Sequence, residues 1–298
     1  MRVTNKAMYD GIVQNLGTTS EEMIKAHKVV SSGKKINRLS DDPVGFTTVL
    51  DLRSSLAHID QLERNIVLGR SWLVAGESVL DQASEIISKT KELTLQMSDD
   101  TNSRTNRENS ANVVDGYLRQ ILSLANSKVG GRYIFGGTNT DNSPFSFNSD
   151  ETEVLYEGNS TSFSIKIGKD SSIEIGRDGK DIFGESWNGE NIFKTLMDLK
   201  SHLINNDIDG IRGTLDKLDA HFDNLQAFIS DTGGKAIRLD VKEKIIKDLD
   251  FTYTDRKSQL EEADIAEAIM KLNTKELAYN ASLASSAKVM QLSLVNFL

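Results

Sequence analysis

The sequence predicts a mainly α-helical protein with a small inserted β domain, in which both ends of the chain together build an elongated helical rod. Long stretches repeat apolar residues every three or four positions, and the longest segment without this repeat lies between about residues 130 and 190. Such a period marks one face of a helix. The chain also has only two prolines among 298 residues, and 6% of its residues are aromatic. Both values suit long helices better than a compact, loop-rich enzyme.

The first predicted helix covers Met8 to Val30. Its apolar or small residues alternate steps of four and three: Met8, Ile12, Leu16, Thr19, Met23, Ala26 and Val30. This is the heptad spacing of a coiled-coil seam. Residues 31–43 lose the repeat and are predicted to form a linker. Asp42 followed by Pro43 predicts the start of the next helix, because a carboxylate can accept hydrogen bonds from the free N–H groups of a first turn.

The last stretch, Leu260 to Leu298, is predicted to be a second amphipathic helix. Its apolar face comprises Ile265, Ile269, Leu272, Tyr279, Leu283, Met290, Leu294 and Phe297. Alanines between these residues let another helix approach closely. Both ends of the chain therefore carry an apolar helical stripe, and the two stripes either pair with each other or meet neighbouring copies. The alternative is an ordinary helical bundle with its ends tucked in.

Between the ends, a very long helix is expected from Pro43 to Met97. Residues 98–103 break the pattern, and a second helix is expected to reach about Val129. Helical periodicity resumes near Asn191. We expect Gly233-Gly234 to interrupt it, and a last core helix beginning near Leu239 to run directly into the terminal stretch.

The intervening segment reads as a small β domain. Short alternating runs, separated by glycine-containing turns, cover residues 145–147, 154–156, 163–167 and 173–175. Alternation with period two is typical of strands that bury one face.

Composition argues against several functions. The net charge of -9 disfavours nucleic-acid binding, and the first forty residues carry only seven Lys or Arg against three acids. No apolar run approaches the ~20 residues that cross a bilayer. Cysteine is absent, and no metalloprotease, serine-hydrolase or P-loop motif occurs. We expect no cofactor, no nucleic acid and no membrane insertion.

Residues Asn205 to Asp216 resemble a calcium loop, with the pattern N-x-D-x-D-G and an acid at position twelve. Three features disfavour this interpretation. Position one is Asn, position twelve is the short Asp216, and an apolar repeat from Ile208 to Ile229 runs through the segment. A helix N-cap at Asp207 explains the same residues.

Three segments carry a resemblance to a known family. The first reads SGKKIN at residues 32–37 and continues with DDPVG at residues 41–45. The second reads GRYIFGGTNT at residues 131–140, and the third reads LSLVNFL at residues 292–298. The first and last resemble segments of bacterial flagellins and their junction proteins, and the middle one is closer to the hook-associated protein 3 branch. The resemblance implies an axial structural subunit that joins hook to filament, without enzymatic activity. It also implies an extracellular position in the flagellum, after export through the flagellar secretion apparatus without a cleaved signal peptide.

The resemblance further implies three domains. Residues 1–38 and 256–298 would form a terminal coiled-coil domain that is disordered in the monomer, residues 39–137 and 191–255 a helical rod domain, and residues 138–190 a β-rich outer domain. The implied partners are other copies of the chain in a ring, the first hook-associated protein on the hook side, flagellin on the filament side and a flagellar export chaperone.

The candidate assembly interface comprises the apolar residues of the two terminal helices: Met8, Ile12, Leu16, Met23, Val30, Ile265, Ile269, Leu272, Leu283, Met290, Leu294 and Phe297. Two other functions stay open. One is a filament-forming flagellin, and the other is an intracellular helical protein that binds partner helices.

Overall fold

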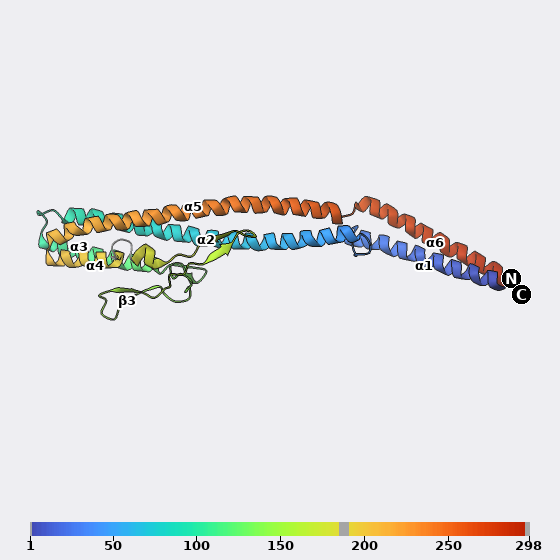
Figure 1. Cartoon of the computed structure of the whole chain (residues 1–298), viewed down its shortest axis with the longest axis horizontal. Helices are drawn as coiled ribbons and strands as arrows, with labels where there is room; N and C mark the ends of the chain where they lie inside the picture. Colours follow the sequence, from blue (N-terminus) through green and yellow to red (C-terminus); the bar gives the residue numbers. More distant parts are fainter. Residues whose placement is uncertain (1, 185–190, 296–298) are drawn as a thin grey trace. The chain divides into compact units, whose positions relative to one another are not determined.

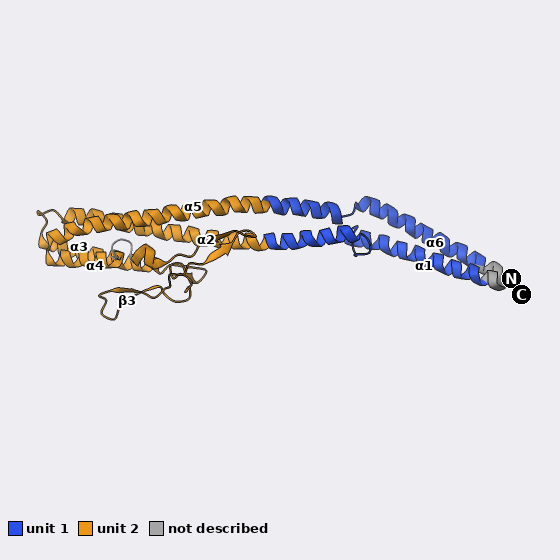
Figure 2. Cartoon of the chain, viewed as in Figure 1, with its two compact units in different colours: residues 1–59, 248–298 blue, residues 60–247 orange. Residues whose placement is uncertain are grey.

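The computed structural model describes the backbone of residues 2–184 and 191–295, and the side chains of residues 6–184 and 191–289. The predicted mainly α fold with a small β insertion is confirmed. The helices are α1 (Arg2–Ser32), α2 (Pro43–Met97), α3 (Arg104–Ala125), α4 (Ile192–Asn205), α5 (Ile208–Glu261) and α6 (Ile265–Val295), with a short π-helix, η1 (Lys180–Gly184). The chain divides into two compact units, residues 1–59 with 248–298 and residues 60–247 (Figure 2).

In the first unit, α1 and α6 lie side by side over most of their length and run in opposite directions (Figure 1). Of the two arrangements that the sequence left open, the structure shows the pairing of the two ends with each other. Gly33, with φ of +68°, ends α1, and its N–H donates to the Val29 carbonyl over 2.9 Å. The predicted start of the next helix is also confirmed, because the Asp42 carboxylate accepts a 2.9 Å hydrogen bond from the Gly45 N–H.

The segment after α1 pairs with the end of α5. The Lys35 N–H donates to the Glu261 carbonyl over 2.8 Å, and the Ala263 N–H donates to the Gly33 carbonyl over 2.9 Å. These two bonds tie the two places where unit 1 departs from helical structure into one joint, which comprises residues 33–42 and 261–264.

Two expectations about α5 are wrong. The helix runs unbroken through Gly233 and Gly234, because Leu225 and Leu239 on either side are fully buried. Their burial outweighs the roughly 1 kcal/mol that each glycine costs a helix. The break falls at residues 262–264 instead, where the Asp264 carboxylate accepts a 2.9 Å bond from the Ala266 N–H and so begins α6 as a separate helix.

The helix expected to reach Val129 ends earlier, at Ala125. Lys128–Val129 forms β1 and pairs with β2 (Arg132–Tyr133) across Gly130 and Gly131, both of which have positive φ. A tight hairpin thus begins within the segment expected to be helical, since glycines that accept positive φ favour a two-residue turn over helix continuation.

The core of unit 2 is built from the predicted seven-residue repeat of α2. Ile66, Leu73, Leu80 and Ile87 are each at most 2% exposed. The residues that complete this core come from the other three helices of the unit, and all are at most 3% exposed: Val114, Leu118, Ile121, Leu196, Leu199, Leu218 and Leu225. The helical pattern read from the sequence therefore marks a real buried face.

The β segment consists of separate antiparallel hairpins. β3 (Phe145–Phe147) pairs with β4 (Val154–Tyr156), and β5 (Ser164–Lys166) pairs with β6 (Ser172–Glu174). The β5–β6 hairpin packs on α2 at Gly69, where a β-carbon would overlap Cδ1 of Ile165. Asn65 of α2 also donates a 2.9 Å bond to the Lys166 carbonyl. The hairpin is thus attached to a helix about a hundred residues earlier in the chain.

A buried guanidinium joins two turns of unit 2. Arg107 is 2% exposed and donates to the carbonyls of Met97 and Asp99 over 3.0 and 2.8 Å, and to Oδ1 of Asn206 over 2.6 Å. Asn206 lies between α4 and α5 with φ of +58°. One side chain therefore fixes both the α2–α3 and the α4–α5 connection.

Candidate assembly surface on the paired terminal helices

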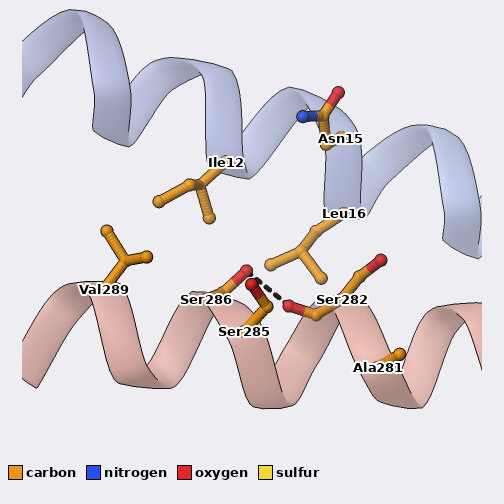
Figure 3. Close-up of a pocket in the computed structure, with 8 residues that line it drawn as sticks. All are labelled: Ile12, Asn15, Leu16, Ala281, Ser282, Ser285, Ser286 and Val289. Carbon is orange, nitrogen blue, oxygen red and sulfur yellow. Dashed lines mark hydrogen bonds between the residues drawn. The ribbon is translucent and has the colours of Figure 1, made fainter.

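The seam between α1 and α6 uses the stripe predicted for α1. Ile12, Leu16, Met23 and Val30 are half-buried, whereas Met8 remains 49% exposed. The side chains of Ile12 and Leu16 point toward α6 in Figure 3. The heptad repeat of the first helix thus marks its contact with the last one.

On α6 the seam differs from the predicted stripe. The buried and half-buried positions recur at steps of four and three, and they are Ala268, Leu272, Lys275, Tyr279, Ser282, Ser286 and Val289. Only Leu272 and Tyr279 of the predicted stripe belong to this set. Much of the α6 side of the seam is therefore formed by small or polar residues.

The other predicted α6 residues lie beside the seam. Ile265, Ile269 and Leu283 are 45%, 44% and 41% exposed. Met290 and Leu294 belong to α6, but their side chains are outside the described set, and Phe297 lies outside the described residues altogether. Met270 and Leu277, which the sequence reading did not select, are 63% and 71% exposed. The helix pair therefore presents several large apolar side chains on its outer surface.

Packing within the seam is loose. Ile12 and Leu16 face Ser282, Ser285 and Ser286 across a groove of about 320 Å³ (Figure 3). The Ser286 hydroxyl donates to the carbonyl of Ser282 over 2.6 Å, so it bonds within its own helix and not across the seam. Serine side chains bury little apolar area, so this part of the pair gains little from the hydrophobic effect.

An ion pair joins the two helices on the surface. Lys275 Nζ lies 2.7 Å from Oε2 of Glu22, and the two side chains are 41% and 47% exposed. An exposed pair of this kind contributes about 0–1 kcal/mol. Among the described side chains, the α1–α6 pair is consequently held by a partly filled seam and a solvated ion pair.

The joint at the end of α5 contains a buried carboxylate that contacts two basic side chains, unlike the exposed ion pair between α1 and α6. The Glu261 side chain is only 5% exposed, and its Oε1 lies 2.6 Å from Nζ of Lys34 and also contacts the guanidinium of Arg53. Burial raises the pKa of this carboxyl, but the hydrogen bond from Lys34 and the positive charges of Arg53 and Lys34 outweigh it, so the net pKa is lowered. The carboxylate is therefore the charged centre of the joint.

The helix-cap interpretation of the Asn205 to Asp216 segment is confirmed. α4 ends at Asn205, α5 begins at Ile208, and Oδ1 of Asp207 accepts a 3.1 Å bond from the Gly210 N–H. The Gly210 N–H and then His202 lower the pKa of Asp207. Because the helix begins at the fourth residue of the segment, the twelve-residue loop that calcium binding requires is not formed.

The described part of the chain contains neither a group of metal-binding side chains nor a helix suited to span a membrane. Within residues 2–184 and 191–295, no three His, Asp or Glu side chains are grouped closely enough to hold a metal ion. None of the helices described in that part of the chain has the length and apolar character needed to cross a bilayer. The notable surface in unit 1 is thus the outer face of the helix pair.

Comparison with known proteins finds similarity to proteins of the bacterial flagellum. Residues 3–140 match the bacterial flagellin N-terminal helical region. The chain is 30% identical over 184 residues to the flagellar hook-associated protein 3 of Escherichia coli K12, a match covering 61% of this chain and 57% of that protein. It is also 27% identical over 127 residues to a flagellin of Clostridium tyrobutyricum, covering 43% and 34% of the two chains.

A solved structure shares the fold. The putative flagellar hook-associated protein of Vibrio parahaemolyticus aligns with a TM-score of 0.69 at 21% identity, over 74% of this chain and all of that one. The chain therefore shares the fold of this helical protein. More particularly, its sequence is similar to flagellar hook-associated protein 3, as its motifs predicted, and the chain spans little more than half the length of that curated relative.

Proposed function

We propose that this protein is a structural subunit of the bacterial flagellum that acts as a junction adaptor between hook and filament. One observation carries the proposal: its paired terminal helices hold each other through a loose seam while large apolar side chains remain exposed outside. Exposed apolar surface of this kind is typical of a site that binds other protein chains. The similarity to hook-associated protein 3 supports the same role.

The proposed interface combines two sets of residues. The exposed set, Met8, Ile265, Ile269 and Leu283, would contact neighbouring copies, whereas Ile12, Leu16, Met23, Val30 and Leu272 hold the helix pair. Met290, Leu294 and Phe297 complete the proposed set from the sequence pattern alone. Each copy would bury its exposed side chains against the next, so that a ring of copies adapts one helical surface to another.

The loose seam supports a proposal about order. Terminal helices that gain little from packing on each other become ordered chiefly when neighbours cover them, because ordering a helix costs conformational entropy. We therefore propose that residues 1–38 and 256–298 form a terminal domain that folds on assembly, beside a helical domain of residues 39–137 with 191–255 and an outer β domain of residues 138–190.

The proposed partners follow from the junction role. They are copies of the chain itself, the first hook-associated protein on one side, flagellin on the other and an export chaperone before assembly. The proposed location is outside the cell in the flagellum, reached by the flagellar secretion apparatus, and the proposed role includes no enzymatic activity.

The test is to place the protein on isolated flagella. Immunogold labelling should mark one zone between hook and filament, and deletion of the gene should leave hooks without filaments while flagellin is released into the medium. Label spread along the whole filament would favour the filament-flagellin alternative, which the match to flagellin supports. Absence of the protein from flagella would favour the intracellular alternative.

A further inference from the structure

A basic groove lies at the end of α1 and on the loop that follows. It measures about 370 Å³, and Ile24 and Val29 give it apolar walls beside Lys25, Lys28 and Arg38. Ile24 is 59% exposed. The groove therefore combines positive charge with an accessible apolar surface.

The groove is lined by more basic than acidic side chains. Its one acidic lining residue, Asp41, accepts hydrogen bonds from the N–H groups of Asn37 and Arg38 over 3.1 and 2.9 Å. Within the part of the chain that the structure describes, the side chains of Lys25, Lys28 and Arg38 form no ion pair. An acidic partner can therefore gain charge-assisted contacts here without breaking existing ones.

A surface of opposite character occurs on α5 in the same unit. Phe251 is 75% exposed, and Asp248 and Asp255 lie three residues before and four residues after it, on the same face of the helix. Among the described residues, Asp248 forms no ion pair, and Asp255 accepts only a hydrogen bond from Gln259. An exposed aromatic ring flanked by two carboxylates is a typical anchor for an interface, where aromatic residues are enriched.

We infer that the basic groove of one copy receives the Phe251 patch of a second copy. The groove offers apolar walls for the ring and cations for Asp248 and Asp255. A second copy is the favoured occupant because the chain carries a net charge of -9 while its first forty residues are basic, so that its own remaining surface is complementary to this groove. The inference rests on the proposed function, which brings copies of the chain together.

The geometry of such a contact has a consequence. Groove and patch are different surfaces of one chain, so a head-to-tail contact leaves one groove and one patch free at the two ends, and repeating this contact generates a ring or a helix. A polyanion such as a lipid surface or nucleic acid would use the cations, but it would leave Ile24 without an apolar partner.

Disulfide trapping tests the contact. Because the sequence contains no cysteine, the two introduced cysteines are the only thiols that this chain contributes. Ser40 lines the groove and Thr252 adjoins Phe251, so Ser40→Cys and Thr252→Cys preserve every proposed anchor. Two differently tagged full-length chains, one with each substitution, are co-expressed in cells lacking the native gene, and isolated flagella are oxidised. We expect a dimer band that carries both tags.

The matched control replaces Ser40→Cys by Ser54→Cys, an exposed serine outside the groove, and should give no such band. If the chains are present on flagella but the Ser40 and Thr252 cysteines form no dimer, or if Ser40→Cys links to a different protein, the docking inference is wrong and the proposed function stands. If the chains are absent from flagella, the proposed function fails and the docking inference fails with it.

A charge exchange provides a second readout that does not depend on disulfide geometry. Lys28→Glu should reduce incorporation about tenfold, which corresponds to about 1.4 kcal/mol. Combining it with Asp248→Lys should restore incorporation to within about twofold. Failure of the second substitution to restore the first would overturn the pairing of these surfaces.

Discussion

The carboxylate of Glu261 lies 2.6 Å from the ammonium group of Lys34, and this contact links the last turn of α5 to the segment that follows α1. The carboxylate is buried while the lysine is 43% exposed, so the acid is the partner that depends most on the interaction. Removing a partner from a buried charge costs more than an exposed ion pair contributes.

Glu261→Gln should therefore loosen the joint by about 1–3 kcal/mol at neutral pH, because a charged acceptor is replaced by a neutral one. The pKa of Glu261 is lowered in the folded chain, so its contribution is present above the ordinary value of 4.5 and is lost as pH falls through the folded pKa. Amide exchange at Lys35 and Ala263 should thus be faster in the variant at pH 7, and the difference should shrink under acid. The exposed Glu262→Gln serves as control, and equal exchange in both variants would contradict the prediction.

Leu283→Asp should leave unit 2 folded and reduce incorporation into flagella by more than about tenfold. Leu283 is 41% exposed and lies beside the α1–α6 seam, so the new charge would be buried only where a neighbouring copy covers it. Asn280→Asp adds the same charge at an exposed polar position of the same helix and should be tolerated. Swimming assays and the amount of protein on isolated flagella provide the measurement, and normal motility of the Leu283 variant would refute the prediction.

Arg107→Met should destabilise unit 2 by about 3 kcal/mol, because it removes three hydrogen bonds from a buried guanidinium and leaves their acceptors unpaired. Urea unfolding followed by circular dichroism measures the loss. Arg104→Met, three residues earlier, breaks only a solvated pair with Glu108 and should cost less than about 1 kcal/mol. Similar losses for both variants would show that burial of Arg107 does not decide its contribution.

Gly233→Ala and Gly234→Ala should each raise the free energy of unfolding by up to about 1 kcal/mol. Both glycines are helical with φ in the ordinary range, and a β-carbon at either position meets open space. Alanine therefore gains helix propensity without a clash. Thermal unfolding checks this, and a lower midpoint in either variant would indicate that the chain needs a flexible point there.

Most of the fold could be predicted from the sequence because each helix buries one face, and a buried face requires apolar residues every three or four positions. The α2 repeat at Ile66, Leu73 and Leu80 is an example. The sequence predicts a break at Gly233-Gly234, whereas the break lies between α5 and α6 at residues 262–264, because burial of Leu225 and Leu239 outweighs the local preference of the two glycines. The conventional capping signal at Asp264 was present and could have located the break.

The candidate site was predicted on one helix better than on the other. The α1 stripe is regular, so Ile12 and Leu16 identify the seam. On α6 the large apolar residues Ile269 and Leu283 lie beside the seam, while Ser282 and Ser286 occupy it. A reading based on apolar residues selects the side chains that remain exposed, and it cannot detect a seam formed by serines. Likewise, no local pattern relates Lys34 to Glu261, which are far apart in the chain.

At Gly69, helix propensity and packing against Ile165 favour different residues. Considered as a position in a 55-residue helix, residue 69 is best served by alanine, and an optimisation of α2 by itself would place it there. Considered as the position on which a hairpin packs, it must leave room for Cδ1 of Ile165, which a β-carbon would displace. The helix therefore keeps a residue of low helix propensity at its contact with the hairpin, and a thermostabilised redesign of α2 that placed alanine there would have to move Ile165.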